Sequence, residues 1–214
     1  MSEHLESLLD QSLRSLLPRI HERIIRRTSW LGVKTGKNPL DFWVYQELLT
    51  ADRPDWIIEI GNNWGGGALA LAHLCDLLGH GRVLGIDISH ARISTRVREH
   101  PRVTLIEGDA VERFADARAL LRPSDRVMVI EDSSHTFDNT LAVLRTYGDL
   151  IHPGGHLIVE DSICHHGLDL GPSPGPYEAI EAFLAENADF VAERALESFL
   201  ITMNPKGFLR RIDH

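Results

Sequence analysis

The chain has 214 residues, of which 43% are hydrophobic and 25% are charged, as in ordinary soluble globular proteins. This length suffices for one α/β domain with a two-sided core. The net charge of −9, without any long basic block, argues against nucleic acid as a partner. No apolar run approaches the length of a membrane span, and the acidic N-terminus lacks the apolar segment of a signal peptide. We therefore expect a cytoplasmic protein that does not bind membranes, with Cys75 and Cys164 as free thiols.

The first 50 residues are expected to form a helical cap beside the main domain. Leucine and isoleucine recur at helical spacing over residues 4–27, which predicts an amphipathic helix that is broken or kinked at Pro18. A second helix is predicted over residues 40–50. We interpret residues 1–50 as a cap or an oligomer contact and expect a homo-oligomer, while residues 51–214 form the main domain.

Strands and helices alternate over the rest of the chain. Short apolar runs with β-branched content predict buried parallel strands at residues 56–60, 82–86, 103–107, 126–131 and 155–160. Helical patterns lie between or after them, at residues 67–79, 89–99, 111–121, 137–151 and 177–186. Two further strand-like runs, 198–203 and 207–211, are separated by a turn. This order predicts an α/β fold: a doubly wound, Rossmann-like, mostly parallel sheet with an antiparallel edge strand and helices on both faces.

The first predicted strand ends in an acid and opens onto a glycine cluster, Glu59-Ile-Gly-Asn-Asn-Trp-Gly-Gly-Gly67. A strand, a tight turn and a helix in this order are typical of a nucleotide-type α/β site. A dinucleotide fingerprint has a glycine at the position of Asn63, and that glycine lets the backbone approach a pyrophosphate. Its absence here argues against NAD or FAD as the cofactor. An acid before the turn suits a ligand with a cationic end. S-adenosylmethionine (SAM) carries an α-amino group and a sulfonium but no phosphate, and we predict it as the cofactor.

Acidic residues also follow the next strands, where ligands bind in open α/β sheets. Asp87 could accept hydrogen bonds from ribose hydroxyls, or it could cap a helix that begins near residue 89. Asp109 could accept from the adenine amino group, cap the next helix, or do both. The predicted cofactor-binding residues are Glu59, Gly61, Asn63, Trp64, Gly65, Asp87, Ile88, Gly108, Asp109 and Glu131.

Three acids at the ends of neighbouring strands, Asp132, Glu160 and Asp161, form a predicted metal site. Almost no lysine or arginine flanks them, so we expect that ion pairs do not account for all three, and clustered carboxylates repel one another unless a cation lies between them. Mg²⁺ prefers such oxygen ligands. The alternative is helix caps and solvated acids. His135 lies three residues after Asp132 and could accept a proton near neutral pH, although a lone histidine can also be structural. We predict Asp132 and His135 as the catalytic residues.

Residues 162–176 form the one long irregular loop of the sequence, and a loop of that length is often a lid or a substrate loop. His165 and His166 within it could contact substrate or solvent. Among the aromatic residues, Trp43 and Tyr45 are expected in the core.

At these residues the chain resembles the family that groups cephalosporin hydroxylase proteins with rhamnosyl and macrolide-sugar O-methyltransferases. The most specific part is the Asp132-x-x-His135 pattern with the later Glu160-Asp161 pair. The resemblance spans most of the chain and is also carried by residues 39–47, 59–61, 85–87, 107–109, 153–161, 175–180 and 199–211. It implies a SAM-dependent, Mg²⁺-requiring O-methyltransferase in which the three acids bind the metal and His135 is the base. One departure is Glu131, where relatives often have Asp, and the chain is shorter than the macrolide enzymes.

Together, the residues and the resemblance predict a class I SAM-dependent O-methyltransferase that acts on a hydroxyl of a sugar or small natural product. Two alternatives stay open. An oxidoreductase (hydroxylase) component of natural-product biosynthesis would show redox turnover without methyl transfer, although no two-His-one-carboxylate iron site is evident. A non-catalytic SAM-fold binding protein would bind the cofactor without turnover.

Overall fold

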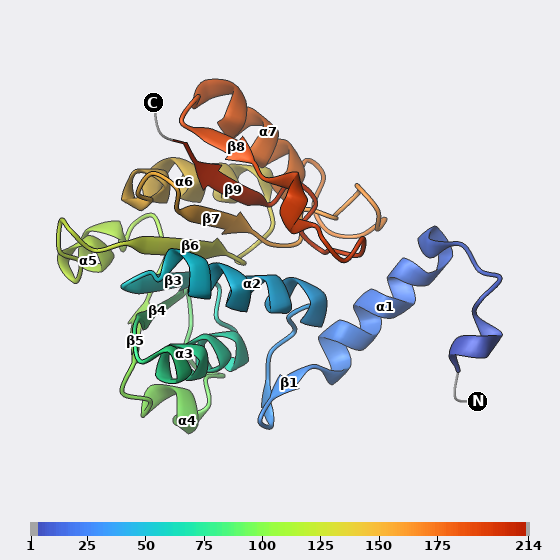
Figure 1. Ribbon diagram of the computed structural model, residues 1–214, viewed down its shortest axis with the longest axis horizontal. Coiled ribbons are helices and arrows are strands. Elements are labelled where there is room, and N and C mark those ends of the chain that lie inside the picture. Colours follow the sequence, from blue (N-terminus) through green and yellow to red (C-terminus); the bar gives the residue numbers. More distant parts are fainter. Residues whose placement is uncertain (1–3, 213–214) are drawn as a thin grey trace.

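In a computed structural model, which describes residues 4–212, one seven-stranded sheet runs through the molecule (Figure 1). The strand order is β5-β4-β3-β6-β7-β9-β8, in which the first five strands are parallel and β9 pairs antiparallel with both β7 and β8. The strands are β3 (Trp56–Ile60), β4 (Arg82–Asp87), β5 (Val103–Glu107), β6 (Val127–Glu131), β7 (His156–Val159), β8 (Phe190–Ala192) and β9 (Phe208–Arg211). The predicted doubly wound, mostly parallel α/β sheet is confirmed.

The central strands are apolar on both faces because helices cover both sides of the sheet. Ile58 of β3 lies opposite Leu84 of β4 and Val129 of β6, and all three side chains are fully buried. One face packs against α6 (Phe137–Tyr147) and α7 (Pro176–Glu186), and the other against α2 (Pro39–Asp52) and α3 (Gly66–Leu78). Because the first five strands in the sheet order are parallel, their carboxyl ends meet at one edge of the sheet, and the glycine loop between β3 and α3 lies at that edge.

The N-terminal part of the chain differs from the predicted cap in its details. A 3-10 turn (Leu5–Ser7) is followed by α1 (Leu13–Arg27), which is capped by Ser12 and continues through Pro18 without a break. In Figure 1, α1 extends away from the sheet. A short hairpin, β1 (Ser29–Trp30) and β2 (Val33–Lys34), then leads into α2, which packs in the core of the sheet.

Three predicted elements are corrected. The helix expected at 89–99 is reduced to α4 (Thr95–Arg98), and α5 is short as well (Phe114–Ala119). The strand expected at 198–203 is irregular, and β8 takes the place beside β9. The reason is that this segment bonds to side chains: the amide of Met203 donates to Oδ2 of Asp41 at 2.8 Å. Two 3-10 turns, Gly148–Leu150 and Arg194–Leu196, complete the described elements. No helix within residues 4–212 is long and apolar enough to cross a membrane.

Candidate active site

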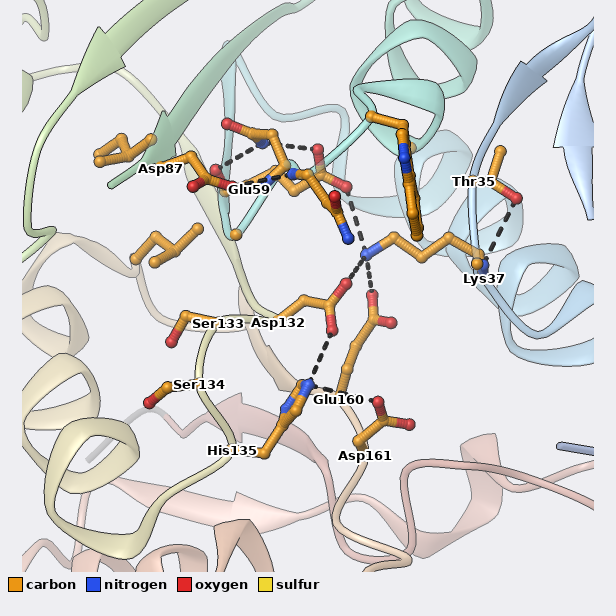
Figure 2. Close-up of a pocket in the computed structure, with 18 of the residues that line it drawn as sticks. Thr35, Lys37, Glu59, Asp87, Asp132, Ser133, Ser134, His135, Glu160 and Asp161 are labelled. Atoms are coloured by element: carbon orange, nitrogen blue, oxygen red, sulfur yellow. Dashed lines mark hydrogen bonds and ion pairs between the residues drawn. The ribbon is translucent and has the colours of Figure 1, made fainter. Parts of the chain in front are cut away.

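A cavity of about 580 Å³ opens at the carboxyl ends of the parallel strands. The glycine loop and the residues after β4 and β5 line one part of it, and the residues after β6 and β7 line another. Figure 2 shows the acids of both parts facing the same space. This is the edge at which ligands bind in open α/β sheets.

Gly61 lets the ends of β3 and β6 approach each other. Its φ is +88°, and a Cβ there would lie 2.0 Å from the carbonyl oxygen of Asp132. The amide of Asp132 in turn donates to the carbonyl of Ile60 at 2.8 Å. The glycine loop and the acid that begins the predicted metal site are therefore held in direct contact.

Asp87 holds the glycine loop closed. Its Oδ2 accepts hydrogen bonds from the amides of Asn62 and Asn63, both at 2.8 Å, and its Oδ1 accepts from the amide of Ser89 at 3.1 Å. No helix begins at Ser89, so the helix-capping alternative for Asp87 is wrong, and Ser94 caps α4 instead. Asp87 lines the cavity, and hydrogen bonding to the ribose hydroxyls remains a hypothesis for it.

Asp109 and Gly108 also line the cavity. Oδ1 of Asp109 accepts from the amides of Val111 and Glu112, at 2.9 and 3.1 Å, which stabilises the turn that precedes α5. The N-cap of α5 is Arg113, so the alternative that Asp109 caps the next helix is wrong, and its contact with the adenine stays a hypothesis. Exposed Ile88 and the ring of Trp64 line the same part of the cavity.

Glu59 is only 1% exposed, although it lines the cavity. Its Oε2 accepts from the side-chain amide of Asn62 at 2.8 Å, and its Oε1 lies 3.2 Å from Nζ of Lys37. Burial raises the pKa of the Glu59 carboxyl, while Lys37 lowers it. A cofactor amino group would therefore share this carboxylate with two groups of the chain itself.

Two predicted cofactor residues do not line the cavity. Gly65 is the N-cap of α3, has a φ of +81°, and packs against Val97. Glu131 is 1% exposed, and burial raises its pKa to about 7. The hydroxyl of Ser133 donates to its Oε1 at 2.6 Å. Ser133 does line the cavity, so Glu131 contacts a residue of the cavity wall without lining the cavity itself.

Asp132, His135 and Asp161 converge where β6 and β7 end. Nε2 of His135 lies 3.4 Å from Oδ2 of Asp161 and 3.8 Å from Oδ1 of Asp132 (Figure 2). One ligand atom from each of the three lies within 4.8 Å of the others, a spacing that a metal ion could bridge. His135 and Asp161 both have left-handed backbone, with φ of +56° and +54°. Such strain in non-glycine residues concentrates at functional sites.

Lys37, which the sequence analysis missed, pairs with these acids. Its Nζ lies 2.6 Å from Oδ2 of Asp132 and 2.6 Å from Oε1 of Glu160, and its side chain is 7% exposed. Burial alone lowers the pKa of Lys37, but Asp132, Glu160 and Glu59 together raise it well above its usual value. Lys37 thus pairs with Asp132 and Glu160 from a loop 95 and 123 residues away, so it is a partner that the residues flanking the acids did not indicate.

The pKa values of Glu160 and Asp161 are raised despite this lysine. Burial raises the pKa of Glu160 well above its usual value, and Asp132 adds to the effect, while Lys37 opposes it. Burial also raises the pKa of Asp161, against the opposing effect of His135. Buried carboxylates that repel one another are suited to a hard divalent cation, and their oxygens are the donors that Mg²⁺ prefers.

The loop at residues 162–176 contributes no residue to the lining of the cavity. Its residues Ile163 and Leu168 instead pack with Ile24 of α1, and the ring of His166 stacks on Tyr177 with centroids 3.7 Å apart. The wall on this side of the cavity is built from α1 and one C-terminal residue: His21, Ile24, Ile25 and Met203. The loop therefore supports α1, and α1 lines the site.

The two aromatic residues expected in the core have different outcomes. Tyr45 is 1% exposed in the core, as expected, whereas Trp43 is 58% exposed and the expectation of core packing for it is wrong. Trp30 donates to Nδ1 of His73 at 2.9 Å and does not line the cavity. Lys34 Nζ lies 3.7 Å from the ring centroid of Trp64, which does line it.

A family model described as Rhamnosyl O-methyltransferase/CmcI matches residues 22–212. The chain belongs to this family. Within the rhamnosyl O-methyltransferase/CmcI family, it is 34% identical over 193 residues to the rhamnosyl O-methyltransferase of Mycobacterium bovis (strain BCG / Pasteur 1173P2), which covers 86% of this chain and 78% of that protein. The protein of the same name from Mycobacterium leprae (strain TN) is 34% identical over 192 residues, which covers 86% and 83%.

Solved structures agree with the fold of this family. A structure of CmcI with Mg and SAM has a TM-score of 0.69 at 24% identity, and covers 87% of this chain and 77% of that one. The O-methyltransferase TomG from Streptomyces achromogenes, in complex with SAM, has a TM-score of 0.61 at 18% identity, with coverage of 95% and 92%. The rhamnosyl O-methyltransferase/CmcI member described here is therefore a class I SAM-dependent O-methyltransferase, as the resemblance implied.

Proposed function

We propose that this protein transfers the methyl group of SAM to a hydroxyl of a sugar or another small natural product, with Mg²⁺ bound by its acids. The observation that carries the proposal is that one cavity joins the glycine loop to the cluster of Asp132, His135 and Asp161. The relatives support the direction: the mycobacterial proteins are named rhamnosyl O-methyltransferases, and a CmcI structure contains Mg and SAM.

The cofactor would lie along the glycine loop. Asp87 would accept from the ribose hydroxyls while it keeps the loop amides of Asn62 and Asn63. Ile88 and Trp64 offer apolar surface for the adenine, and Asp109 lies at the same end of the cavity. The methionine end would point toward Glu59, so that the sulfonium methyl faces the space above Asp132.

Asp132, Glu160 and Asp161 would hold the Mg²⁺. The fit rests on their chemistry and placement: carboxylate oxygens that line one cavity, and pKa values of Glu160 and Asp161 that burial raises. When bound, a divalent ion supplies a Lewis acid that makes a neighbouring acceptor hydroxyl more acidic. A more acidic hydroxyl loses its proton more readily, and its oxygen then becomes the nucleophile.

His135 would take the proton of the acceptor hydroxyl as the oxygen attacks the methyl group in line. Its ring projects into the cavity and is 27% exposed, so an acceptor can reach Nε2. Asp161 and Asp132 face the same nitrogen and would stabilise the positive charge that the ring gains with the proton. The left-handed backbone of His135 fixes the direction in which the ring leaves the chain.

The acceptor would lie between the acids and α1. His21, Ile24 and Ile25 of α1 form that wall with Met203, and the wall combines apolar surface with one polar ring. A glycosylated natural product has this same combination of apolar and hydroxyl-bearing parts. Exposed Leu5, Leu9 and Leu13 near the start of α1 also support self-association, which light scattering on the purified protein would test.

Calorimetric titration with S-adenosylhomocysteine, with Mg²⁺ and with chelator, is the first test. Micromolar binding followed by methyl transfer to hydroxylated sugars would support the proposal. Binding without turnover on any acceptor would favour a non-catalytic role, and the absence of binding in every condition would overturn the assignment of the cavity to SAM.

A further inference from the structure

The ammonium of Lys37 lies between the two halves of the cavity (Figure 2). On one side it is 3.2 Å from Glu59, which holds the glycine loop, and on the other it is 2.6 Å from both Asp132 and Glu160. The Lys37 side chain is 7% exposed, so solvent screens these contacts very little. Lys37 is thus a buried positive charge shared among three buried or half-buried carboxylates.

At Asp132, Lys37 and the predicted metal site use different oxygens. Asp132 directs Oδ2 to Lys37 and Oδ1 toward Nε2 of His135, at 3.8 Å. Glu160 directs Oε1 to Lys37. The ammonium therefore lies on the side of Asp132 that faces away from His135 and Asp161, and it does not fill the space between them.

The glycine cluster is shaped to admit this lysine. A Cβ on Gly67 would lie 2.2 Å from Oε1 of Glu59 and 2.8 Å from Cε of Lys37. A Cβ on Gly66 would lie 2.2 Å from the carbonyl oxygen of Lys34, in the segment that leads to Lys37. Neither glycine is needed for a positive φ, so their role here is to let the lysine loop lie against the start of α3.

We propose that Lys37 is a resident counter-cation of the acid site, which neutralises part of its charge when no divalent ion is bound and limits the affinity for that ion when one is. The proposal rests on the proposed metal site at Asp132, Glu160 and Asp161. It assigns Lys37 a positioning and charge-setting role, since its contacts are with carboxylates of the chain.

Two measurable consequences follow from the charge. A divalent ion held by these acids would be repelled by the ammonium at Oδ2 of Asp132, so removal of that charge tightens ion binding. Without the ion, the same removal leaves buried carboxylates uncompensated and destabilises the folded protein. The ion would then restore more stability to the variant than to the wild type.

The test is titration of the full chain with Mn²⁺, followed by electron paramagnetic resonance of the free ion. We expect Lys37→Met to bind Mn²⁺ at least about tenfold more tightly than the wild type, because loss of a unit charge a few ångströms away exceeds one tenfold step in affinity. We also expect a larger Mn²⁺-induced rise in its thermal midpoint. Lys37→Gln, which is neutral but can still donate a hydrogen bond, should behave in the same way and serves if Lys37→Met does not fold.

Two controls separate charge from position. Lys37→Arg keeps the charge and should keep an affinity near that of the wild type. Lys34→Met removes a cation from the same segment, one that lies over Trp64 and not on the acids, and should leave Mn²⁺ affinity unchanged.

Unchanged or weaker Mn²⁺ binding in both neutral variants, with normal binding by the wild type, would overturn the inference and leave the proposed function standing. No Mn²⁺ binding by any form of the protein would overturn the metal part of the proposed function as well. Titration with S-adenosylhomocysteine then reports on the cofactor site independently.

Discussion

Asp52 and His156 are hydrogen-bonded across the molecule, with Oδ2 of the aspartate 2.6 Å from Nδ1 of the imidazole. The other ring nitrogen of His156 lies 3.0 Å from Oε2 of Glu193. This buried histidine thus ties the end of α2 to β7 and to the residue after β8. Burial lowers the pKa of His156, but the two carboxylates raise it above its usual value in the balance.

The stability of the fold should therefore fall as the pH rises. The unfolded imidazole has a pKa of about 6.5, and because folding raises this value, the stabilisation is complete below about pH 6.5 and is lost as the pH rises through the folded-state pKa. Urea unfolding at several values from about pH 6 to about pH 9 would show the decline, and His156→Gln should flatten it. If His156→Gln shows the same decline, the pH dependence of stability arises from other groups. His80→Gln, at a histidine that is 34% exposed, should retain the decline.

Replacement of Asp132 by Asn should abolish methyl transfer and leave S-adenosylhomocysteine binding largely intact. The change removes a charge that both Lys37 and the proposed ion use, and we expect a loss of activity of at least about a hundredfold. Activity assays and calorimetry on the same preparation measure the two effects. Asp138→Asn, at an exposed acid in the first turn of α6, is the matched control. Full activity of Asp132→Asn in the presence of chelator would contradict a metal role for this carboxylate.

Removal of the ring of His135 should lower the rate by roughly 10²–10⁴-fold, the usual contribution of a general base. His135→Ala should also change the pH–rate profile of the enzyme, which is measured on the same preparation. His165→Ala is the control, because His165 shares the left-handed backbone but bonds to the carbonyl of Gly171 outside the cavity. An unchanged pH–rate profile in His135→Ala would exclude it as the base.

A methyl group on Gly67 should disturb both halves of the cavity. The Cβ of Gly67→Ala would lie 2.2 Å from Oε1 of Glu59, and the forced shift should cost roughly 1–3 kcal/mol of unfolding free energy, as overpacking usually does. S-adenosylhomocysteine affinity should fall as well, because Glu59 holds Asn62 of the glycine loop. Gly79→Ala, at a helix end with open space around it, should leave that affinity unchanged. Equal effects of the two substitutions on affinity would contradict the steric argument.

The sequence predicts the parallel strands and the acids at their ends because both are local features. The run Trp56–Ile60 is apolar except for Glu59, as expected for a strand that is buried on both faces. Asp87 ends β4, and Asp132 directly follows β6. The same locality explains the failure at β8: only three residues long, it carries no periodic signal. It is anchored by Phe190, whose ring lies 5.2 Å from that of Phe183, whereas Leu200 in the run expected as a strand is 89% exposed.

Lys37 could not be predicted in this way, since its contacts join residues 95 and 123 positions apart. One local signal existed. The glycine cluster contains Gly66 and Gly67 in addition to the glycines that turn the chain, and small residues beyond the need of a turn indicate that another segment packs closely there. The side chain that occupies the space is set by tertiary packing alone.

The left-handed backbone of His135 and Asp161 places a limit on how stable this protein can become. Each such conformation costs a non-glycine residue roughly 1–3 kcal/mol, and glycine at either position would recover part of it. A search for thermostable variants would therefore select glycine at these two positions and discard the imidazole or the carboxylate with it. At His135 and Asp161, the residue that favours stability is not the one that activity needs. A thermostable form of this enzyme must therefore be built by substitutions elsewhere in the chain.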